Sequence, residues 1–541
     1  MVKYCHISTF HINYTEKLPI MNALLISIQK DLDVIGLKSL HYSLLKDGHN
    51  SYLLHLPHFN PDDKIALEYT GRFILKASPA FIGISLMSTE YHSVSYLTKY
   101  LKNRFKSIPV IWGGVHPTIC PEMCVDKADY VCIGEGERTI IDIAKAVSGN
   151  NDLRNINNLC YSEGGQIRKN RLYPLIKDLD GLPLCDNIYA NGFIQGPVGN
   201  IINVDKEIIK KYAKFRGTVY SIMSSRGCPF SCTYCCNNLI SRLYGGNTVR
   251  RRGIDNVISE LENAIICNPE IEYVNFQDDC FLACSEEYLS RFCGAYKKRI
   301  KKPFIARAIP VYLTRNKMKH LSDAGLAWIS LGLQSGSDRI CKDIYNRKSS
   351  KSDFLKAARI IKDFNMAAFY DVILDNPFET VEDKLETIHT LIETPKPFYP
   401  QIFSLSLYLG TELYERAKRE CPEKIEDSLA KDYAAYNKGN INNMIRLSIF
   451  LNRRFMNKII CLYKQDQTGT GYKLIMFAAN LLSSFIFEPL TYFQLLRMSK
   501  DMSYLRALAA LPNYLREGFA LYFKQFKAKT TIKKEQKMLR A

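Results

Sequence analysis

The sequence predicts an α/β protein with a doubly wound parallel sheet, a partial barrel of six strand and helix units, and a helical C-terminal region. Apolar runs of strand length alternate with stretches of helical period before residue 150, which indicates a parallel sheet with helices on both faces. The alternation resumes after residue 215, as in part of an eight-unit barrel. No strand pattern follows residue 420. We therefore expect domains over 1–150, 216–420 and 421–541, with a turn-rich linker and one hairpin over 151–215.

The composition is that of a globular protein with a basic surplus. Of the 541 residues 47% are hydrophobic and 23% charged, which excludes disorder for the bulk of the chain. The net charge of +19 favours an anionic partner such as nucleic acid, a membrane surface or a phosphorylated substrate. Seventeen cysteines behind an N-terminus without a secretory pattern predict a cytoplasmic protein that uses thiols for metal or redox chemistry. The longest apolar run, 474–487, is too short to span a bilayer.

The strand candidates of the first block are KYCHISTF or NALLISI, followed by SYLLHL, FIGISL, VIWGG and YVCIG. Ligands of such sheets bind at the carboxyl ends of the strands, where GISLMST (83–89), GGVHPT (113–118) and GEGE (134–137) fall. Glycines in these turns let backbone approach a ligand closely, although tight turns alone would also use them. A dinucleotide-type GxGxxG motif on the first helix is absent.

The six strand candidates of the barrel are each followed by a helical stretch. They are TVYSIMSS (218–225), IEYVNFQ (271–277), FIARAIP (304–310), WISLGLQ (328–334), AFYDVIL (368–374) and QIFSLSLYL (401–409). Because the chemistry of such barrels lies in the loops after the strands, we expect the reactive residues there.

A cysteine cluster directly follows the first barrel strand, in SSRGCPFSCTYCC. Cys228, Cys232 and Cys235 have the spacing CxxxCxxC, which suits three irons of a four-iron cluster and leaves the fourth iron free for a small molecule. A closed zinc site is the alternative, but structural zinc sites usually combine two separated pairs of ligands. Cys236 is interpreted as a packed thiol outside the ligand set.

These residues resemble the radical S-adenosylmethionine (SAM) superfamily, whose CxxxCxxC motif has an aromatic residue before the last cysteine, as Tyr234 is here. The resemblance covers about 216–420. It implies a [4Fe-4S] cluster that binds SAM and reductively cleaves it to a 5'-deoxyadenosyl radical, which removes a hydrogen atom from an unactivated carbon. It also implies an electron donor such as flavodoxin or ferredoxin.

The resemblance implies SAM contacts in the loops after the barrel strands. Asp278 or Asp279 would face the SAM ammonium group, although an Asp there also caps a helix well. In GLQSGSD, Gln334 and Ser335 would bind the carboxylate or ribose and Gly336 would permit close approach, but the family usually has glutamate at the position of Gln334. The turn DNPFETVED is interpreted as structural, with Glu379 serving the N-terminus of the next helix.

The first block, in the order GGVHPT, YVCIGEGE and LIKDLDGLPLCD, resembles the Rossmann-like cobalamin-binding domain of cobalamin-dependent radical SAM enzymes. The resemblance covers about 1–185 and implies cobalamin contacts at Ser85, Thr89, Gly113, Gly114, His116, Gly134, Glu135 and Gly136. The pattern DxHxxG, whose histidine ligates cobalt in many cobalamin proteins, is absent. His11 lies near the corresponding turn only if KYCHISTF is the first strand, and an exposed loop histidine is the favoured interpretation.

The resemblance implies an enzyme that methylates an unactivated carbon by way of methylcobalamin and the 5'-deoxyadenosyl radical. An oxidative cyclase or a rearrangement enzyme would use the same cofactors. A non-enzymatic zinc-binding interaction protein is a further alternative, whereas a tRNA methylthiotransferase would need a second cysteine cluster and an RNA-binding barrel. The substrate class stays open between soluble, lipid and carrier-linked molecules.

The basic, apolar block 421–541 suits either a helical cap on the barrel or a peripheral contact at the inner membrane face, and nucleic acid is disfavoured.

Overall fold

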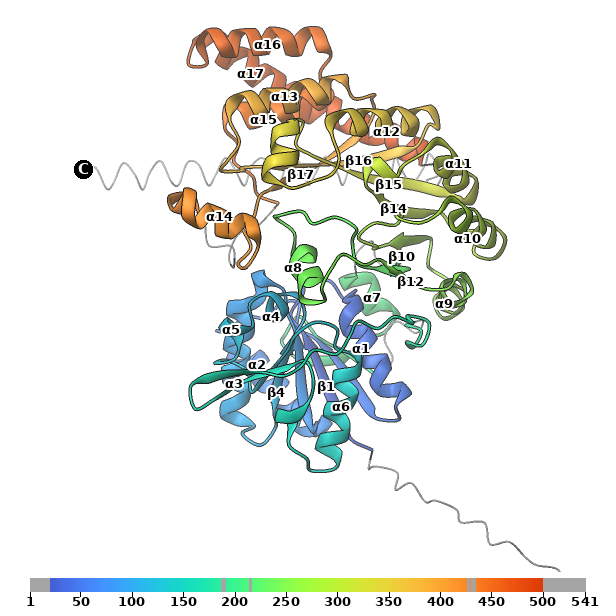
Figure 1. Cartoon of the computed structure of the whole chain (residues 1–541), viewed down its shortest axis with the longest axis vertical. Helices are drawn as coiled ribbons and strands as arrows, with labels where there is room; N and C mark the ends of the chain where they lie inside the picture. The colour runs from blue at the N-terminus through green and yellow to red at the C-terminus, as the bar shows by residue number, and fades with distance from the viewer. Residues whose placement is uncertain (1–19, 186–190, 214–216, 426–428, 430–433, 500–541) are drawn as a thin grey trace, which may run out of the picture.

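Two sheets organise the protein. The computed structural model describes residues 20–185, 191–213, 217–425, 429 and 434–499 (Figure 1). The first sheet has nine strands in the order β7-β6-β5-β4-β3-β1-β2-β8-β9, and the second has six in the order β10-β13-β14-β15-β16-β17. The first sheet and its helices form the lower half of Figure 1, and the second sheet and its helices form the upper half.

The first strand of the chain's described part is NALLIS, not KYCHISTF, which lies outside the described residues together with His11. The strands of the first sheet are β1 (Asn22–Ser27), β2 (Asn50–His55), β3 (Phe81–Ser85), β4 (Val110–Gly113), β5 (Tyr130–Cys132), β6 (Leu159–Glu163), β7 (Gln166–Lys169), β8 (Gly192–Gln195) and β9 (Ile201–Asn203). Strands β1 to β5 and β8 run parallel, and helices cover both faces of the sheet. The helices are α1 (Ile35–Lys46), α2 (Lys64–Ala77), α3 (Tyr91–Arg104), α4 (Val115–Ile119), α5 (Pro121–Cys124) and α6 (Glu137–Ser148).

The segment 151–215 is more structured than the expected linker with one hairpin. It forms two hairpins, β6–β7 and β8–β9, which extend the parallel sheet at its two opposite edges. Leu159 and Cys160 are buried in the cores on the two faces of the sheet, and Ile194 is also buried, because β6 and β8 lie inside the edge strands β7 and β9. Helix α7 (Lys206–Tyr212) then leads towards the barrel.

The second sheet is a partial barrel of six parallel strands and confirms the predicted fold class. Its strands are β10 (Val219–Ile222), β13 (Tyr273–Phe276), β14 (Phe304–Ala308), β15 (Leu326–Gln334), β16 (Ala367–Leu374) and β17 (Tyr399–Ser404). A two-stranded ladder, β11 (Ser225–Arg226) with β12 (Arg250–Arg251), follows β10. The barrel's helices are α8 (Cys236–Leu243), α9 (Ile254–Cys267), α10 (Glu286–Arg299), α11 (Arg315–Ala324), α12 (Lys351–Asp363), α13 (Val381–Glu393) and α14 (Glu412–Glu420).

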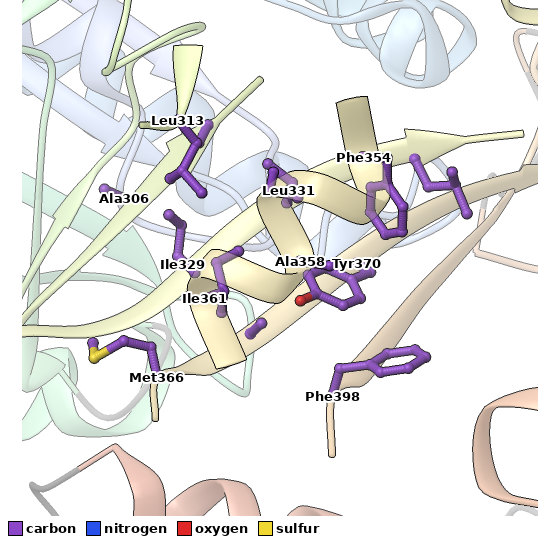
Figure 2. Close-up of a cluster of buried hydrophobic side chains, with 14 of the residues drawn as sticks. Ala306, Leu313, Ile329, Leu331, Phe354, Ala358, Ile361, Met366, Tyr370 and Phe398 are labelled. Carbon is purple, nitrogen blue, oxygen red and sulfur yellow. The ribbon is translucent and has the colours of Figure 1, made fainter. Parts of the chain in front are cut away.

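Side chains alternate between the two faces of the barrel strands. The outer set packs under the helices, where Ile329, Leu331 and Tyr370 meet Phe354 and Ile361 of α12 (Figure 2). The alternate positions face the barrel interior, where Trp328 and Phe369 stack with their ring centroids 4.5 Å apart. Helix α18 (Glu488–Met498) closes this end of the interior by packing Leu495 and other apolar side chains against these rings.

The C-terminal block is helical over its described residues. Its helices are α15 (Asn440–Phe450), α16 (Arg453–Asp466), α17 (Thr470–Leu482) and α18, and a π-helical turn (Ser483–Phe487) joins α17 to α18. The continuous helix Thr470–Met498 has 29 residues and a mean hydropathy of 1.5 in its most apolar window, only 22% of which is buried. The apolar run 474–487 is therefore part of one helix long enough to cross a membrane, although α18 is held against the barrel.

Candidate functional site

The three motif cysteines occupy one loop between β11 and α8. Gly227 opens this loop at φ +97°, and a Cβ there would lie 2.1 Å from the Thr248 carbonyl oxygen, so the turn requires glycine. Thr233 holds the middle of the loop in place. Its backbone amide donates a hydrogen bond to the Tyr345 carbonyl oxygen at 3.0 Å, and its hydroxyl donates to the Ile344 carbonyl oxygen at 2.6 Å. Glycine at 227 and these hydrogen bonds therefore fix the backbone of the cysteine loop without any ligand on the cysteines.

The thiols lie in an apolar setting with Phe230 and Ile309. Burial raises the pKa of Cys228 to about 11 and also raises that of Cys232. Cys236 has a hydrogen bond with Cys235, which raises the pKa of Cys235 and lowers that of Cys236. Thiols of this kind ionise when iron binds, because a metal deprotonates its thiol ligands. Within the described residues no three His, Cys, Asp or Glu converge on a single metal ion, whereas a four-iron cluster takes its three cysteines on separate irons.

The acidic pair after β13 splits into two roles. Asp278 is fully buried and accepts hydrogen bonds from the Ser224 amide at 3.1 Å, the Ser224 hydroxyl at 2.8 Å and the Ser225 hydroxyl. Its carboxylate is therefore occupied in joining β13 to the start of the cysteine loop. Asp279 is exposed, lines the large cavity described below and lies near Cys228 and Cys235. Of the two, Asp279 has a carboxylate that is available to a ligand.

The end of β15 shows a similar division. Gln334 adopts a positive φ of 67°, and its side-chain amide lies over Gly332. Ser335 and Gly336 instead pack against α13, since Ser335 bonds Glu379 and Thr387 and a Cβ on Gly336 would lie 2.5 Å from the Thr387 Cα. Thr380 and Asp383 cap α13, so Glu379 does not serve the helix N-terminus as expected. Burial raises the pKa of Glu379 to about 7.

Arg347, which no sequence motif predicted, is a buried cation beside the cysteine loop. Its guanidinium lies 5.9 Å from the centre of the Phe230 ring, donates to the Gly332 oxygen at 3.0 Å and has a hydrogen bond with Cys232. Its Nε is buried without a partner among the described residues. Tyr234 completes this corner, with its ring centroid 4.8 Å from that of Tyr345. The only sequence signal for Arg347 is a basic residue after the loop that follows GLQSGSD.

A large cavity opens at the carboxyl ends of the first sheet's strands. Its accessible volume of about 340 Å³ lies within the ordinary range of small-ligand pockets. Six of the residues expected to bind cobalamin line it: Ser85, Gly113, Gly114, Gly134, Glu135 and Gly136. A Cβ on Gly114 would lie 2.9 Å from the Leu86 oxygen, and one on Gly134 would lie 1.9 Å from the Tyr244 hydroxyl. Gly114 and Gly134 therefore pack too closely against their neighbours to carry a side chain, and together with the other glycines they form the glycine cradle of the cavity.

Thr89 and His116 do not line this cavity. His116 is fully buried, with Nδ1 3.0 Å from the Ser88 hydroxyl and its ring centroid 5.1 Å from that of Tyr91, so its side chain packs within the domain. The first turn after β1 contains DLDVIG (31–36), with Asp33 where a DxHxxG motif has histidine. Asp33 pairs with the buried Lys38 at 2.6 Å. None of the described residues that line the cavity is a histidine.

The cavity also reaches the barrel. Gly227, Asn237 and Asp279, next to the cysteine loop, line the same space as the glycines of the first sheet. Helix α8 lies between the two halves in Figure 1. A ligand on the first sheet and a ligand at the cysteine loop would therefore face one common chamber.

Glu135 holds the two halves of the chamber together. Its carboxylate accepts hydrogen bonds from Arg226 at 3.1 Å, from Arg250 at 2.8 Å and from the Ile176 amide at 3.0 Å. Burial opposes ionisation, but Arg250 and Arg226 hold the pKa of Glu135 below its usual value. Glu135 was expected to contact cobalamin, but its carboxylate instead forms ion pairs between the two domains.

Glu135→Gln is expected to destabilise the protein by about 3 kcal/mol, because it leaves the buried Arg250 guanidinium without its carboxylate and Arg226 with Glu137 alone. The ion-pair contribution is complete above the unfolded carboxyl pKa and is lost as the pH falls through the lower folded value. Urea unfolding at pH 7 measures the effect. Glu163→Gln, which removes an exposed partner of Arg154, should change stability by less than about 1 kcal/mol; equal losses in both variants would refute the assignment.

Comparison with known families assigns the two halves. The B12 binding domain family matches residues 21–144, and the Radical SAM superfamily matches residues 222–391. The chain is a B12-binding radical SAM enzyme. Its cofactors are therefore cobalamin, a [4Fe-4S] cluster and SAM, which confirms the predicted set. Enzymes of this superfamily take a small-molecule substrate and a reductant.

Two curated relatives and one solved structure resemble this enzyme. An uncharacterized methyltransferase, PH0819 of Pyrococcus horikoshii, is 26% identical over 350 residues, which cover 64% of this chain and 71% of the relative. The anaerobic magnesium-protoporphyrin IX monomethyl ester cyclase of a Synechocystis species is 25% identical over 374 residues, covering 66% and 67%. The cobalamin-dependent radical enzyme OxsB has the same fold, with a TM-score of 0.61, 15% identity and coverage of 95% and 82%.

Proposed function

We propose that this B12-binding radical SAM enzyme transfers a methyl group to an unactivated carbon of a small-molecule substrate. The single observation that carries the proposal is the shared chamber, because the glycine cradle of the first sheet and Asp279 beside the cysteine loop line one cavity. A radical formed at the cysteine loop and a methyl group held on the first sheet would then reach the same substrate within one cavity. The curated relative PH0819, described as a methyltransferase, favours this reaction.

In this proposal each residue has a defined task. Cys228, Cys232 and Cys235 hold the cluster, Asp279 receives the SAM ammonium group, and Arg347 with Gln334 and Tyr234 surrounds the rest of SAM. The unpartnered Nε of Arg347 supports a role as donor to the SAM carboxylate, since a buried guanidinium otherwise lacks one of its hydrogen bonds. The glycines at 113, 114 and 134 face the corrin. When bound, the cluster and SAM supply a hydrogen-abstracting radical, and cobalamin supplies the methyl group.

Product analysis tests the reaction class. Anaerobically reconstituted, cobalamin-loaded enzyme is reduced with SAM, and 5'-deoxyadenosine and S-adenosylhomocysteine are quantified by mass spectrometry. Methyl transfer is expected to give both products, because one SAM is cleaved and another donates its methyl group. Formation of 5'-deoxyadenosine with no S-adenosylhomocysteine would overturn the methyltransferase proposal and favour the cyclase reaction for which the Synechocystis relative is named.

The C-terminal apolar helix, Thr470–Met498, supports a second proposal, a peripheral contact with a membrane. Leu474, Phe477, Leu482, Ile486 and Leu490 are exposed at helical spacing along Thr470–Met498. Such a stripe, beside the basic surplus of the chain, supports our proposal of a peripheral membrane contact through the C-terminal block.

A further inference from the structure

A groove on the outer side of the barrel shares no lining residue with the chamber. It runs between the 3₁₀ turn Pro310–Tyr312, which follows β14, and helix α12 (Figure 1). Val311 lies on one wall and is 41% exposed, and Lys356 and Arg359 lie on the other wall. None of the lining residues has a task in the proposed reaction, so the groove is available to a partner.

The groove has free cations, whereas its carboxylates are paired. Asp353 accepts hydrogen bonds from the residue that caps the start of α12, and Asp363 pairs with Arg315 at 2.7 Å. Lys356 and Arg359 are exposed, and no described residue forms an ion pair or hydrogen bond with either side chain. Two positive charges beside an exposed apolar side chain therefore suit a partner with carboxylates on its surface.

The turn that forms one wall of the groove also packs against the cysteine loop. The residues on either side of Tyr312 line the groove, whereas the Tyr312 ring lies against Phe230 and Cys232 on the other side, with the two ring centroids 6.2 Å apart. Arg347, which has a hydrogen bond with Cys232, is followed by the exposed Lys348. The rings of Tyr312 and Phe230 therefore lie between the groove and the thiols.

We propose that this groove is the docking site of the reductant, an acidic protein that carries one electron at a time. Lys356 and Arg359 bind carboxylates on its surface, and Val311 contacts an apolar side chain within the interface. The reduced carrier loses one electron to the cluster on the cysteine loop, and no atom passes between the two proteins. The proposal rests on the cluster assignment within the proposed function and is independent of methyl transfer.

Binding of flavodoxin, an acidic electron-carrier protein, to the cluster-loaded, full-length enzyme tests the groove. Oxidised flavodoxin is titrated by isothermal titration calorimetry at about 50 mM and about 500 mM salt, because salt screens exposed charges. We expect the wild-type enzyme to bind it more weakly at high salt. The double variant Lys356→Glu, Arg359→Glu should weaken binding at low salt at least about tenfold, since it places like charges against each other.

The double variant Arg291→Glu, Lys297→Glu is the matched control, because both residues are exposed on α10, which α11 separates from α12. It should bind flavodoxin like the wild type. No binding by the wild-type enzyme, or equal losses in the two double variants, would overturn the docking site. An oligonucleotide that binds more tightly than flavodoxin and loses affinity in the groove variant would assign the groove to nucleic acid instead.

Cross-linking of the wild-type complex tests the same site even if a variant fails to fold. A carbodiimide joins lysine amines directly to carboxylates, so peptide mass spectrometry should find Lys356 linked to flavodoxin. Links confined to lysines outside the groove would overturn the proposal.

Reduction rates separate docking from an effect on the cluster. Stopped-flow absorbance should show that reduced flavodoxin reduces the cluster of the groove variant at least about tenfold more slowly than that of the wild type. Titanium(III) citrate, a small reductant that needs no docking site, should reduce both at the same rate, and equal slowing with both reductants would overturn the proposal. Because these measurements need no substrate, failed methyl transfer with intact flavodoxin docking would refute the proposed reaction alone.

Discussion

Cys232→Ala is expected to retain less than about a tenth of the wild-type cluster iron and to form no 5'-deoxyadenosine from SAM. The Cys232 thiol is 6% exposed and lies in an apolar cluster with Phe230, where solvent does not reach to replace it as a ligand. The fold should survive, because the loop backbone is held by Thr233 against the oxygens of Ile344 and Tyr345. Loss of one thiolate leaves two protein ligands, which is too few for a stable site-differentiated cluster.

Iron and sulfide content, visible absorbance and mass spectrometry of the nucleoside product measure the effect on reconstituted protein. Cys236→Ala is the matched control, since Cys236 adjoins Cys235 at the start of α8 yet lies outside the proposed ligand set. It should keep its iron and its product. A Cys232→Ala protein that keeps full iron, or a Cys236→Ala protein that loses it as completely, would show that the ligand assignment is wrong.

Gly114→Ala is expected to reduce cobalamin affinity at least about tenfold without changing cluster content. Gly114 adopts φ +100°, and the added Cβ would lie 2.9 Å from the Leu86 backbone oxygen. A non-glycine residue in such a conformation costs about 1–3 kcal/mol. The strain is relieved when the turn between β4 and α4 moves, and that movement narrows the cradle of the cavity.

Cobalt content after gel filtration and equilibrium titration with hydroxocobalamin measure this loss. Gly294→Ala provides the control with the same chemical change, because Gly294 lies in α10 with open space around its Cα. That variant should bind cobalamin like the wild type. Undiminished cobalamin binding by Gly114→Ala would mean that the turn does not face the corrin.

The sequence alone predicted the fold class and the cluster motif, because both depend on residues that lie close together in the sequence. Strand and helix periods repeat within a few residues. The three cysteines lie within one short loop, whose first turn requires glycine at position 227. The first strand was ambiguous between two apolar runs, and period cannot decide between neighbouring runs of equal length. The structure places β1 at Asn22–Ser27, which puts Asp33, rather than His11, in the corresponding turn.

Only the tertiary structure decided which polar residues are free to act. Asp278 and Asp279 are adjacent in sequence, yet Asp278 accepts hydrogen bonds from Ser224 whereas Asp279 lines the chamber. Glu135 pairs with Arg250 across 115 positions of the chain. Side-chain direction and long-range register depend on packing, and no local pattern in the sequence records them.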